Sequence, residues 1–166
     1  MITIIAGTNR NDSMTLRVAQ VYYKLISEQA DGVNLLSLHE TSMLERNDEF
    51  LEAERRFLIP AEKFVFVMPE YNGSFPGILK LMIDNSDIRK CWWYKKAMLA
   101  GVADGRAGNL RGLDHMTNIL NYMRIQVFYN KIPLSRINEE IDIAGNLLKS
   151  ATLDAIRAQV DGFVKF

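Results

Sequence analysis

The sequence predicts an α/β protein in which a five-stranded parallel sheet carries helices on both faces. The first observation is that short apolar runs alternate five times with longer segments of helical periodicity. The second is that the apolar runs are nearly continuous, which is typical of strands buried on both faces. The third is length: 166 residues, of which 48% are hydrophobic and 24% charged, suffice for one domain and are too few for two. We therefore expect residues 1–166 to form a single domain.

Five apolar runs that end in turn residues are placed as the strands. The first run is broken only by Thr3, and the run with the strongest strand signal begins at Lys63. Glycine and proline punctuate the periodic segments and form no linker. The expected strands are, in chain order, Ile2–Ala6, Val33–Leu38, Lys63–Met68, Lys96–Ala103 and Ile125–Tyr129, the last extending past Asn130 to Ile132 in an alternative interpretation.

Apolar residues at spacings of three and four indicate a helix after each strand. In the second of these helices charged residues dominate, which is typical of a helix on the surface. The expected helices are Leu16–Ile26, Asn47–Leu58, Gly77–Ile88, Leu110–Met123 and Leu148–Phe163. Five such repeats in a small domain are typical of the flavodoxin-like three-layer sandwich with strand order 2-1-3-4-5. That winding binds ligands at the carboxyl ends of its strands.

The charge balance argues against polyanionic partners, and the single cysteine excludes a disulfide and a cysteine zinc cluster within the chain. Lysine plus arginine number 20 and aspartate plus glutamate also number 20, so we expect neither nucleic acid nor an anionic membrane as a partner. Cys91 alone can form neither an intramolecular disulfide nor a cysteine zinc cluster, and no metal site is expected. The segment Met1–Gly7 has no basic flank and only a short apolar run, so it predicts neither a signal peptide nor a membrane span and favours the cytoplasm.

The turn after the first strand is the sharpest candidate for a binding site. Residues 7–13 are Gly-Thr-Asn-Arg-Asn-Asp-Ser, so hydroxyls, an arginine and backbone amides gather where a helix begins. A helix N-terminus carries partial positive charge and unpaired donors, which suits a phosphate dianion. The turn is neither a Walker loop nor a dinucleotide fingerprint, because it lacks their glycines and lysine. The alternative is an ordinary turn in which Ser13 caps the helix.

Two further turns are expected at the same edge of the sheet. Residues 69–76, Pro-Glu-Tyr-Asn-Gly-Ser-Phe-Pro, are stiffened by two prolines, while Gly73 permits a positive φ. This turn could hold backbone donors and the flat face of Tyr71 against a planar ligand, or it could simply cover the sheet end. Residues 105–108 form a glycine turn in which Arg106 is either a second anion contact or a solvated charge.

No set of side chains in the sequence makes a self-contained catalytic centre. His39 and His115 lie far apart in the chain, and each is interpreted as a surface or packing residue. Lys90 could lower the pKa of Cys91, but without a partner cysteine no redox role is expected. A ligand site without acid–base side chains suits a cofactor that carries the chemistry itself.

The turns resemble the motifs of the NAD(P)H-dependent FMN reductase family, which is related to quinone, azo and chromate reductases. Residues 7–13 look like the family's Gly-Ser/Thr-x-Arg-x-x-Ser loop, residues 69–80 are similar to its Pro-Glu-Tyr-Asn block, and residues 105–108 match its Gly-x-x-Gly turn. The resemblance spans nearly the whole chain. It departs where the family usually has threonine, asparagine or small residues and this chain has Met68, Leu81, Asp104 and Arg106.

The aromatic row Trp92-Trp93-Tyr94 matches no block of that family. Its three rings fit core packing at the entry to the fourth strand, a roof over the substrate pocket, or a contact between subunits.

The resemblance implies FMN as the cofactor and assigns its contacts. Thr8, Arg10 and Ser13 would bind the phosphate, Pro69–Gly73 would line the isoalloxazine ring, and Gly105 with its neighbours would face the other part of the ring. The full set of implied cofactor-binding residues is Thr8, Arg10, Asn11, Ser13, Met14, Pro69, Glu70, Tyr71, Asn72, Gly73, Asp104 and Gly105.

The activity implied is hydride transfer from NADPH or NADH to N5 of the flavin and on to a small acceptor, in ping-pong order. The acceptor would be a flavin, quinone, azo compound or metal oxyanion, no side chain is assigned a catalytic role, and a homodimer or homotetramer is expected. One alternative is a flavodoxin-like electron carrier or FMN-binding module without nicotinamide turnover, and another is a protein that kept the fold and lost the cofactor. Arg10 and the zero net charge argue against the carrier, because such carriers are usually acidic and hold phosphate without arginine.

Overall fold

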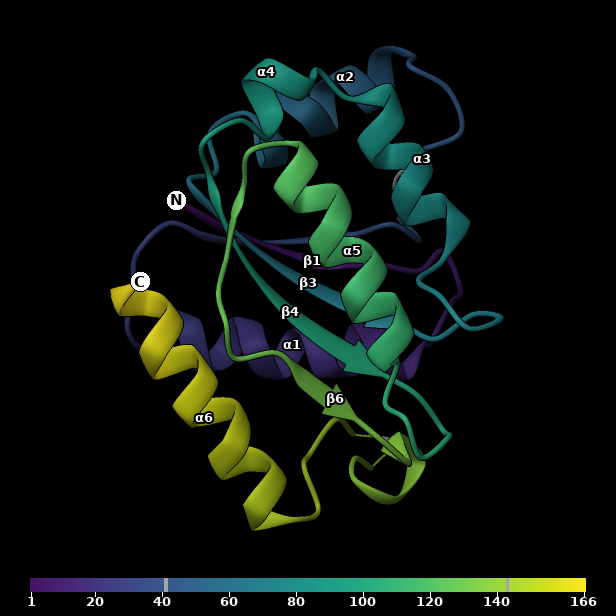
Figure 1. The fold of residues 1–166 in the computed structure, drawn as a ribbon, viewed down its shortest axis with the longest axis vertical. Helices are drawn as coiled ribbons and strands as arrows, with labels where there is room; N and C mark the ends of the chain where they lie inside the picture. The colour runs from purple at the N-terminus through teal and green to yellow at the C-terminus, as the bar shows by residue number, and fades with distance from the viewer. Residues whose placement is uncertain (41, 143) are drawn as a thin grey trace.

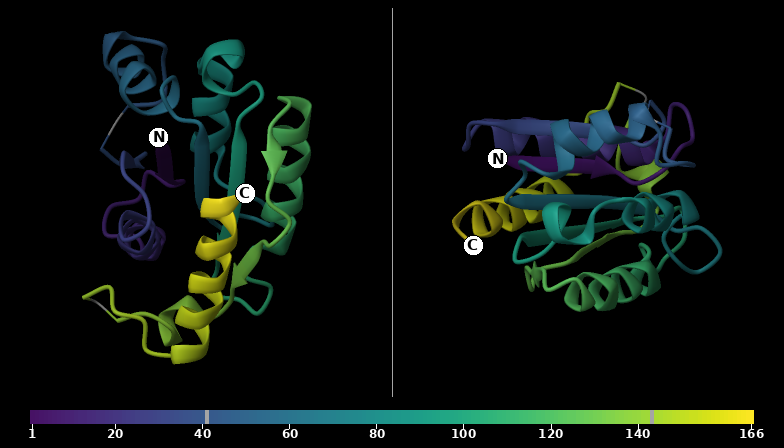
Figure 2. Two further views of the ribbon diagram at one scale, coloured as in Figure 1. Left: turned by 90° about the vertical axis from the view of Figure 1, so that its left-hand side faces the viewer. Right: turned by 90° about the horizontal axis from the view of Figure 1, so that it is seen from above.

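The computed structural model describes residues 1–40, 42–142 and 144–166, which form a sheet between two layers of helices (Figure 1). The strands follow the order β2-β1-β3-β4-β5, with β6 also paired to β4, and every pairing is parallel. In Figure 2 the purple α1 and the green α5 lie on opposite sides of the strands. The flavodoxin-like fold class and the strand order predicted from the sequence are confirmed.

The first four strands lie close to their expected positions. They are β1 (Ile2–Ala6), β2 (Val33–Ser37), β3 (Lys63–Pro69) and β4 (Lys96–Val102). The strands β3 and β4 pair along their whole length, and every residue of β1 is buried. The continuous apolar runs therefore do mark strands covered on both faces.

The prediction of one continuous fifth strand over Ile125–Tyr129 is wrong, because the structure has two short strands in this part of the chain instead. The structure has a short β5 (Gln126–Val127) beside the start of β4, and β6 (Ile132–Leu134) beside its end. Between them the side-chain amide of Gln159 donates to the carbonyls of Leu99 (3.0 Å) and Asn130 (2.7 Å). A buried side chain thus replaces a rung of the backbone ladder, and sequence periodicity carries no signal for that replacement.

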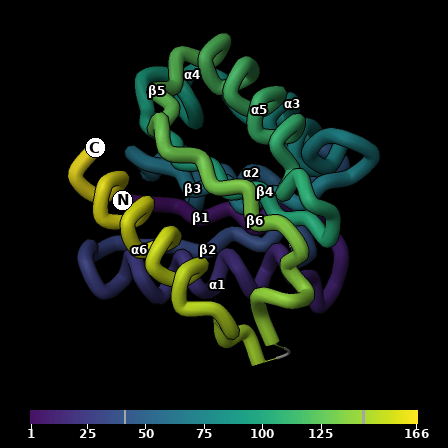
Figure 3. Tube along the Cα trace, turned by 60° about the horizontal axis from the view of Figure 1, so that its bottom comes forward, coloured from purple at the N-terminus to yellow at the C-terminus, as the bar shows by residue number. Residues whose placement is uncertain are grey.

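The helices cover the two faces of the sheet with separate apolar cores. On one face lie α1 (Met14–Ser27) and α6 (Ser150–Lys165), packed on Ile4, Val65 and Met98. On the other face lie α2 (Asp48–Ala53), α3 (Gly77–Asn85), α4 (Ile88–Cys91) and α5 (Leu110–Tyr122), packed on Ile5, Phe64 and Phe66. Figure 3 shows α1 and α6 on one side of the strands and α3, α4 and α5 on the other.

Two helices differ most from their predicted extents, and the others agree to within about two residues at each end. The expected surface helix over Asn47–Leu58 is α2 followed by one π-helical turn, η1 (Glu54–Leu58), in which Ile59 N donates to the carbonyl of Glu54. Glu54 is buried at 4% exposure, so the charged pattern concealed an inward-facing carboxylate.

The helix expected over Gly77–Ile88 ends at Asn85. Ser86 is extended (ψ 156°), and the Asp87 carboxylate then caps α4 by accepting from the backbone N–H groups of Arg89 and Lys90. A short 3-10 turn, η2 (Ile137–Glu139), follows β6.

The aromatic row splits between the interior and the surface. Trp92 is fully buried against Phe64 and Phe66, and its indole N–H donates to Ser86 Oγ (2.6 Å). Trp93 is half-buried, and Tyr94 is 72% exposed. Core packing therefore accounts for Trp92 but not for Tyr94. Within the residues described, the structure contains no helix with the length and apolar character needed to cross a membrane.

Candidate functional site

The turns that follow β1, β3 and β4 meet at the carboxyl edge of the sheet and enclose a hollow of about 390 Å³. They are named the first, third and fourth turns, after the strands that they follow. This volume lies within the range of roughly 300–1,000 Å³ that small-molecule and cofactor sites occupy. The edge is the one at which the β4 arrow ends in Figure 1. The lining residues are Arg10, Asn11, Ser13, Met14, Thr15, Pro69, Glu70, Tyr71, Asn72, Val102, Ala103, Asp104, Ile137 and Asn138.

The turn after β1 presents the N-terminus of α1 and one cation to the hollow. Ser13 is the N-cap of α1, and its hydroxyl oxygen accepts from Leu16 N (3.1 Å). Its O–H proton is left for a ligand, since a hydroxyl can accept and donate at once. The guanidinium carbon of Arg10 lies 4.2 Å from the centroid of the Tyr71 ring. The capping interpretation and the anion-site interpretation of this turn are thus compatible.

Thr8 organises the turn from within. It is 2% exposed and is not among the residues that line the hollow. Its hydroxyl lies 2.6 Å from the Tyr71 hydroxyl and accepts from Arg10 N (3.3 Å). Thr8 therefore joins the turn after β1 to the turn after β3. Tyr71 contacts the turn after β1 twice, with its hydroxyl at Thr8 and with its ring at Arg10.

The turn after β3 is held by reciprocal backbone bonds. Tyr71 N donates to Ser74 O (2.8 Å), and Ser74 N donates to Tyr71 O (3.1 Å). Asn72 and Gly73 between them have φ of 52° and 79°, so the positive φ expected at Gly73 is present and extends to Asn72. Gly73 itself does not line the hollow.

Side chains of α5 support the third turn from outside. His115 Nδ1 lies 2.9 Å from Ser74 Oγ, and an Arg111 guanidinium nitrogen lies 3.9 Å from the Glu70 carboxylate. The other histidine, His39, is exposed and lies 3.2 Å from the carbonyl of Asn9. The histidines thus contact two different turns, as structural residues rather than as a shared acid–base pair.

The turn after β4 rests on a buried asparagine that sequence reasoning missed. Asn109 is fully buried with φ 67°, and its amide donates to the carbonyls of Met68 and Pro69 (both 3.0 Å). Its side-chain oxygen accepts from Gly112 N (3.2 Å), which caps α5. Asn109 therefore joins the fourth turn to the start of the third. Asn after a glycine turn, immediately before a helical pattern, is the signal that could have found it.

Other parts of the hollow also lie outside the sequence-based set. Asp104 lines the hollow, but Gly105 does not. The Gly105 carbonyl accepts from Arg136 N (3.2 Å) in the segment after β6. The unpredicted lining residues are Thr15, Val102, Ala103, Ile137 and Asn138. Val102 and Ala103 end the fourth predicted strand and could have been included on that ground. Nothing in the sequence pattern places η2 at this edge.

Cys91 is excluded from thiol chemistry by its surroundings. Burial first, and then the neighbouring Glu54 carboxylate, raise the pKa of the Cys91 thiol to about 12. The expectation that Lys90 could lower this pKa is wrong, because Lys90 is exposed and pairs with Asp87 (3.8 Å). A neutral thiol at physiological pH is a poor nucleophile.

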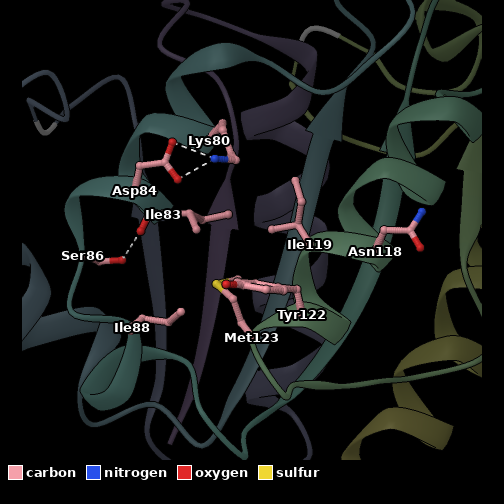
Figure 4. Close-up of a pocket in the computed structure, with 9 residues that line it drawn as sticks. All are labelled: Lys80, Ile83, Asp84, Ser86, Ile88, Asn118, Ile119, Tyr122 and Met123. Carbon is pink, nitrogen blue, oxygen red and sulfur yellow. Dashed lines mark hydrogen bonds and ion pairs between the residues drawn. The ribbon is translucent and has the colours of Figure 1, made fainter.

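A second, larger hollow lies between the outer faces of α3 and α5. This groove of about 510 Å³ is lined by Lys80, Ile83, Asp84, Ser86, Ile88, Asn118, Ile119, Tyr122 and Met123. Figure 4 shows Ile83 and Ile119 pointing toward each other across it, with Lys80 bonded to Asp84 at the rim. The groove is mainly apolar, and its one cation is already paired, so it lacks the donors that an anionic cofactor needs.

The donor set at the carboxyl edge fits FMN. A phosphate needs a cation and N–H donors, and the first turn brings Arg10, Ser13 and the N-terminus of α1 to one end of the hollow. A planar ring needs a narrow cleft with backbone groups at its rim, and the turn over Tyr71 and Asn72 provides them. The fold and this site define a flavodoxin-like flavoprotein.

Comparison with known proteins narrows the class to a family. A family profile described as NADPH-dependent FMN reductase matches residues 1–138. The chain therefore belongs to this family. It is accordingly an NAD(P)H-dependent flavin oxidoreductase with FMN as its cofactor. The sequence-based identification of the family is confirmed.

Two relatives agree with this assignment, and one solved structure agrees with the fold. A 2-hydroxy-1,4-benzoquinone reductase of a Burkholderia species is 26% identical, over 98% of this chain and 93% of the relative. A quinone reductase of Pseudomonas putida is 29% identical, over 69% of this chain and 65% of the relative. The NAD(P)H:(acceptor) oxidoreductase FerB of Paracoccus denitrificans shares the fold with a TM-score of 0.78 at 23% identity, over 99% of this chain and 94% of that chain.

Proposed function

We propose that this protein reduces quinones with NAD(P)H through FMN held in the carboxyl-edge hollow. The observation that carries the proposal is the meeting of Arg10, the N-terminus of α1 and the Tyr71–Ser74 turn around one cavity of ligand size. The quinone is favoured among the small acceptors because two of the relatives are named quinone reductases.

Different residues would bind the phosphate and the ring of FMN. Arg10, Asn11 and Ser13 would hold the phosphate, with Thr8 acting through Arg10 N and the Tyr71 hydroxyl. Residues 69–72 would line the ring, with Met14 and Asp104 on its other sides. Gly73 would act through the shape of the turn, since it does not itself line the hollow. Gly105 would act through the backbone of the fourth turn, since it does not itself line the hollow.

The reaction needs no acid–base side chain. Bound FMN supplies the site that takes a hydride from NAD(P)H and passes it on. In the balanced reaction NAD(P)H becomes NAD(P)⁺, and the quinone gains the hydride and one proton from solvent water to become the hydroquinone. The chain's residues orient the two substrates, which would enter the same open side of the hollow in turn and so follow a ping-pong order.

We propose further that the protein is a homodimer or homotetramer. The apolar groove between α3 and α5 supports this, because Tyr122 at its edge is 83% exposed and contiguous exposed apolar surface is typical of protein contacts. Sedimentation velocity of the FMN-loaded protein tests this statement, and a monomer at micromolar concentration would contradict it.

Anaerobic reduction tests the function directly. The purified protein loaded with FMN is mixed with NADPH or NADH without air while the visible spectrum is recorded. The yellow colour should bleach within seconds and return when a quinone is added. A yellow protein that keeps its colour is a carrier, and a colourless protein that ignores added FMN is neither carrier nor reductase.

A further inference from the structure

The charges that line the hollow do not balance once a phosphate is bound. Among the described lining residues, Arg10 is the cation and Glu70 and Asp104 are the anions. If Arg10 pairs with the phosphate, as the proposed function requires, two carboxylates remain on the described lining with no further lining cation to offset them. Fields from charges along one cleft act together on whatever enters it.

The two carboxylates differ in how far their charge is offset. Glu70 has the Arg111 guanidinium at 3.9 Å, across the outer side of the third turn. Asp104 is exposed, and its partner is the neutral Asn138 amide, which donates to the carboxylate at 2.7 Å. Among the described residues, Asp104 therefore has a neutral partner and no paired cation, although it lines the hollow.

The position of Asp104 is fixed on both sides. Ile137 N donates to the carbonyl of Ala103 (3.1 Å), and Arg136 N donates to the carbonyl of Gly105 (3.2 Å). Together with the bond from Asn138, these contacts hold the aspartate between β4 and η2. The Arg136 guanidinium lies 4.0 Å from Glu139, and Arg106 is exposed and does not line the hollow.

We propose that Asp104 makes the acceptor site select uncharged quinones over anionic acceptors such as sulfonated quinones, metal oxyanions and free FMN. The inference rests on the proposed function and deepens it, because it names the charge class of the acceptor. A like charge about 6 Å away in a water-exposed cleft lowers the rate constant for an anion by roughly three- to tenfold. The effect fades as salt screens the two charges.

The test compares acceptors within each enzyme. FMN-loaded wild-type protein and the Asp104→Asn variant are assayed with 1,4-naphthoquinone and with 1,4-naphthoquinone-2-sulfonate, and kcat/KM is measured for each acceptor. In a ping-pong scheme kcat/KM for the acceptor reports only the half-reaction with that acceptor, so binding of NADPH does not enter. The ratio of the two values cancels any common change in activity or in FMN content.

The Asp104→Asn variant should raise the sulfonate-to-neutral ratio by about three- to tenfold at low salt. The Glu139→Gln variant, which removes a carboxylate outside the hollow, should leave the ratio as it is in wild type. The wild-type ratio itself should rise toward that of Asp104→Asn at about 0.2 M salt, which tests the idea even if the variant fails to fold.

The outcomes separate the two proposals. Quinone reduction with the same ratio in wild type and Asp104→Asn, or with a wild-type ratio indifferent to salt, overturns the charge selection and leaves the proposed function intact. An FMN-loaded protein that oxidises no NAD(P)H, or reduces neither quinone, overturns both.

Discussion

The carboxyl-edge hollow and the groove between α3 and α5 are built by opposite means. The groove is the larger, about 510 Å³ against about 390 Å³, and it is walled by the apolar faces of two regular helices. The hollow is walled by turns whose shape depends on buried polar bonds and positive φ at Asn72, Gly73 and Asn109. Size therefore does not identify a cofactor site; the placement of donors and of one cation does.

The largest effect is expected where that polar framework is buried. Asn109→Ala should lower the free energy of unfolding by about 2–4 kcal/mol, because it removes a helix cap and leaves the carbonyls of Met68 and Pro69 without their donor. Asn118→Ala, the same change at an exposed position of the same helix, should cost less than about 0.5 kcal/mol. Urea unfolding measures both, and equal losses would contradict the comparison.

Beside the groove residues Ser86 and Ile88, the chain is bonded to a buried carboxylate that is paired with a partly exposed arginine. Both Glu54 oxygens accept from Arg46 (2.9 Å each), and one also accepts from the backbone N–H of Asp87 (2.7 Å) at the junction of α3 and α4. The Glu54 side chain is 5% exposed and that of Arg46 is 42% exposed, so solvent screens part of the attraction. Glu54→Gln should therefore cost about 1.5–3 kcal/mol at pH 7.

The pH dependence of that loss follows from the Glu54 pKa. Burial by itself raises this pKa, but the bonds from Arg46, Asp87 and Cys91 outweigh it and hold the pKa below its ordinary value of 4.5. The stabilisation is present above that ordinary value and is lost as the pH falls through the folded pKa. The difference between wild type and Glu54→Gln should shrink below about pH 4.5. A difference that grew on acidification would contradict this assignment.

A smaller effect is expected from the Tyr71 hydroxyl. Tyr71→Phe keeps the ring under Arg10 and removes the 2.6 Å contact with Thr8, so FMN should bind about three- to tenfold more weakly. Riboflavin, which lacks the phosphate, should lose much less affinity. Fluorescence titrations with both ligands measure this. Equal losses of FMN and riboflavin affinity would mean that the Tyr71 hydroxyl acts on the isoalloxazine ring and not on the phosphate.

The sequence predicted the parts of the molecule that periodicity and turn chemistry control. Continuous apolar runs placed β1 to β4, and the residue types of the first and third turns placed Arg10, Ser13 and Tyr71 around one hollow. It failed where one buried polar side chain decides the local structure. Gln159 interrupts the fifth strand, and Glu54 lies inside an apparently solvated helix.

The remaining misses come from long-range contacts. Ile137 and Asn138 reach the hollow only because β6 brings the chain back beside β4, and no local pattern encodes that return. Asn109 carries a helix-cap signal, but the glycines on either side of it predict an ordinary turn equally well. The three turns that meet at the hollow were thus predictable, whereas the buried framework beneath them and the contribution of η2 required the structure.

The central claim is that Arg10 binds the phosphate of FMN in the carboxyl-edge hollow, and a pair of titrations tests it most directly. Arg10→Ala should weaken FMN binding roughly ten- to a hundredfold, because each charge-assisted bond contributes about 1.5–3 kcal/mol, and should leave riboflavin binding nearly unchanged. Lys80→Ala, which removes a cation from the groove, should leave both affinities as they are in wild type. An Arg10→Ala variant that holds FMN as tightly as wild type, or a Lys80→Ala variant that loses FMN instead, would contradict the account.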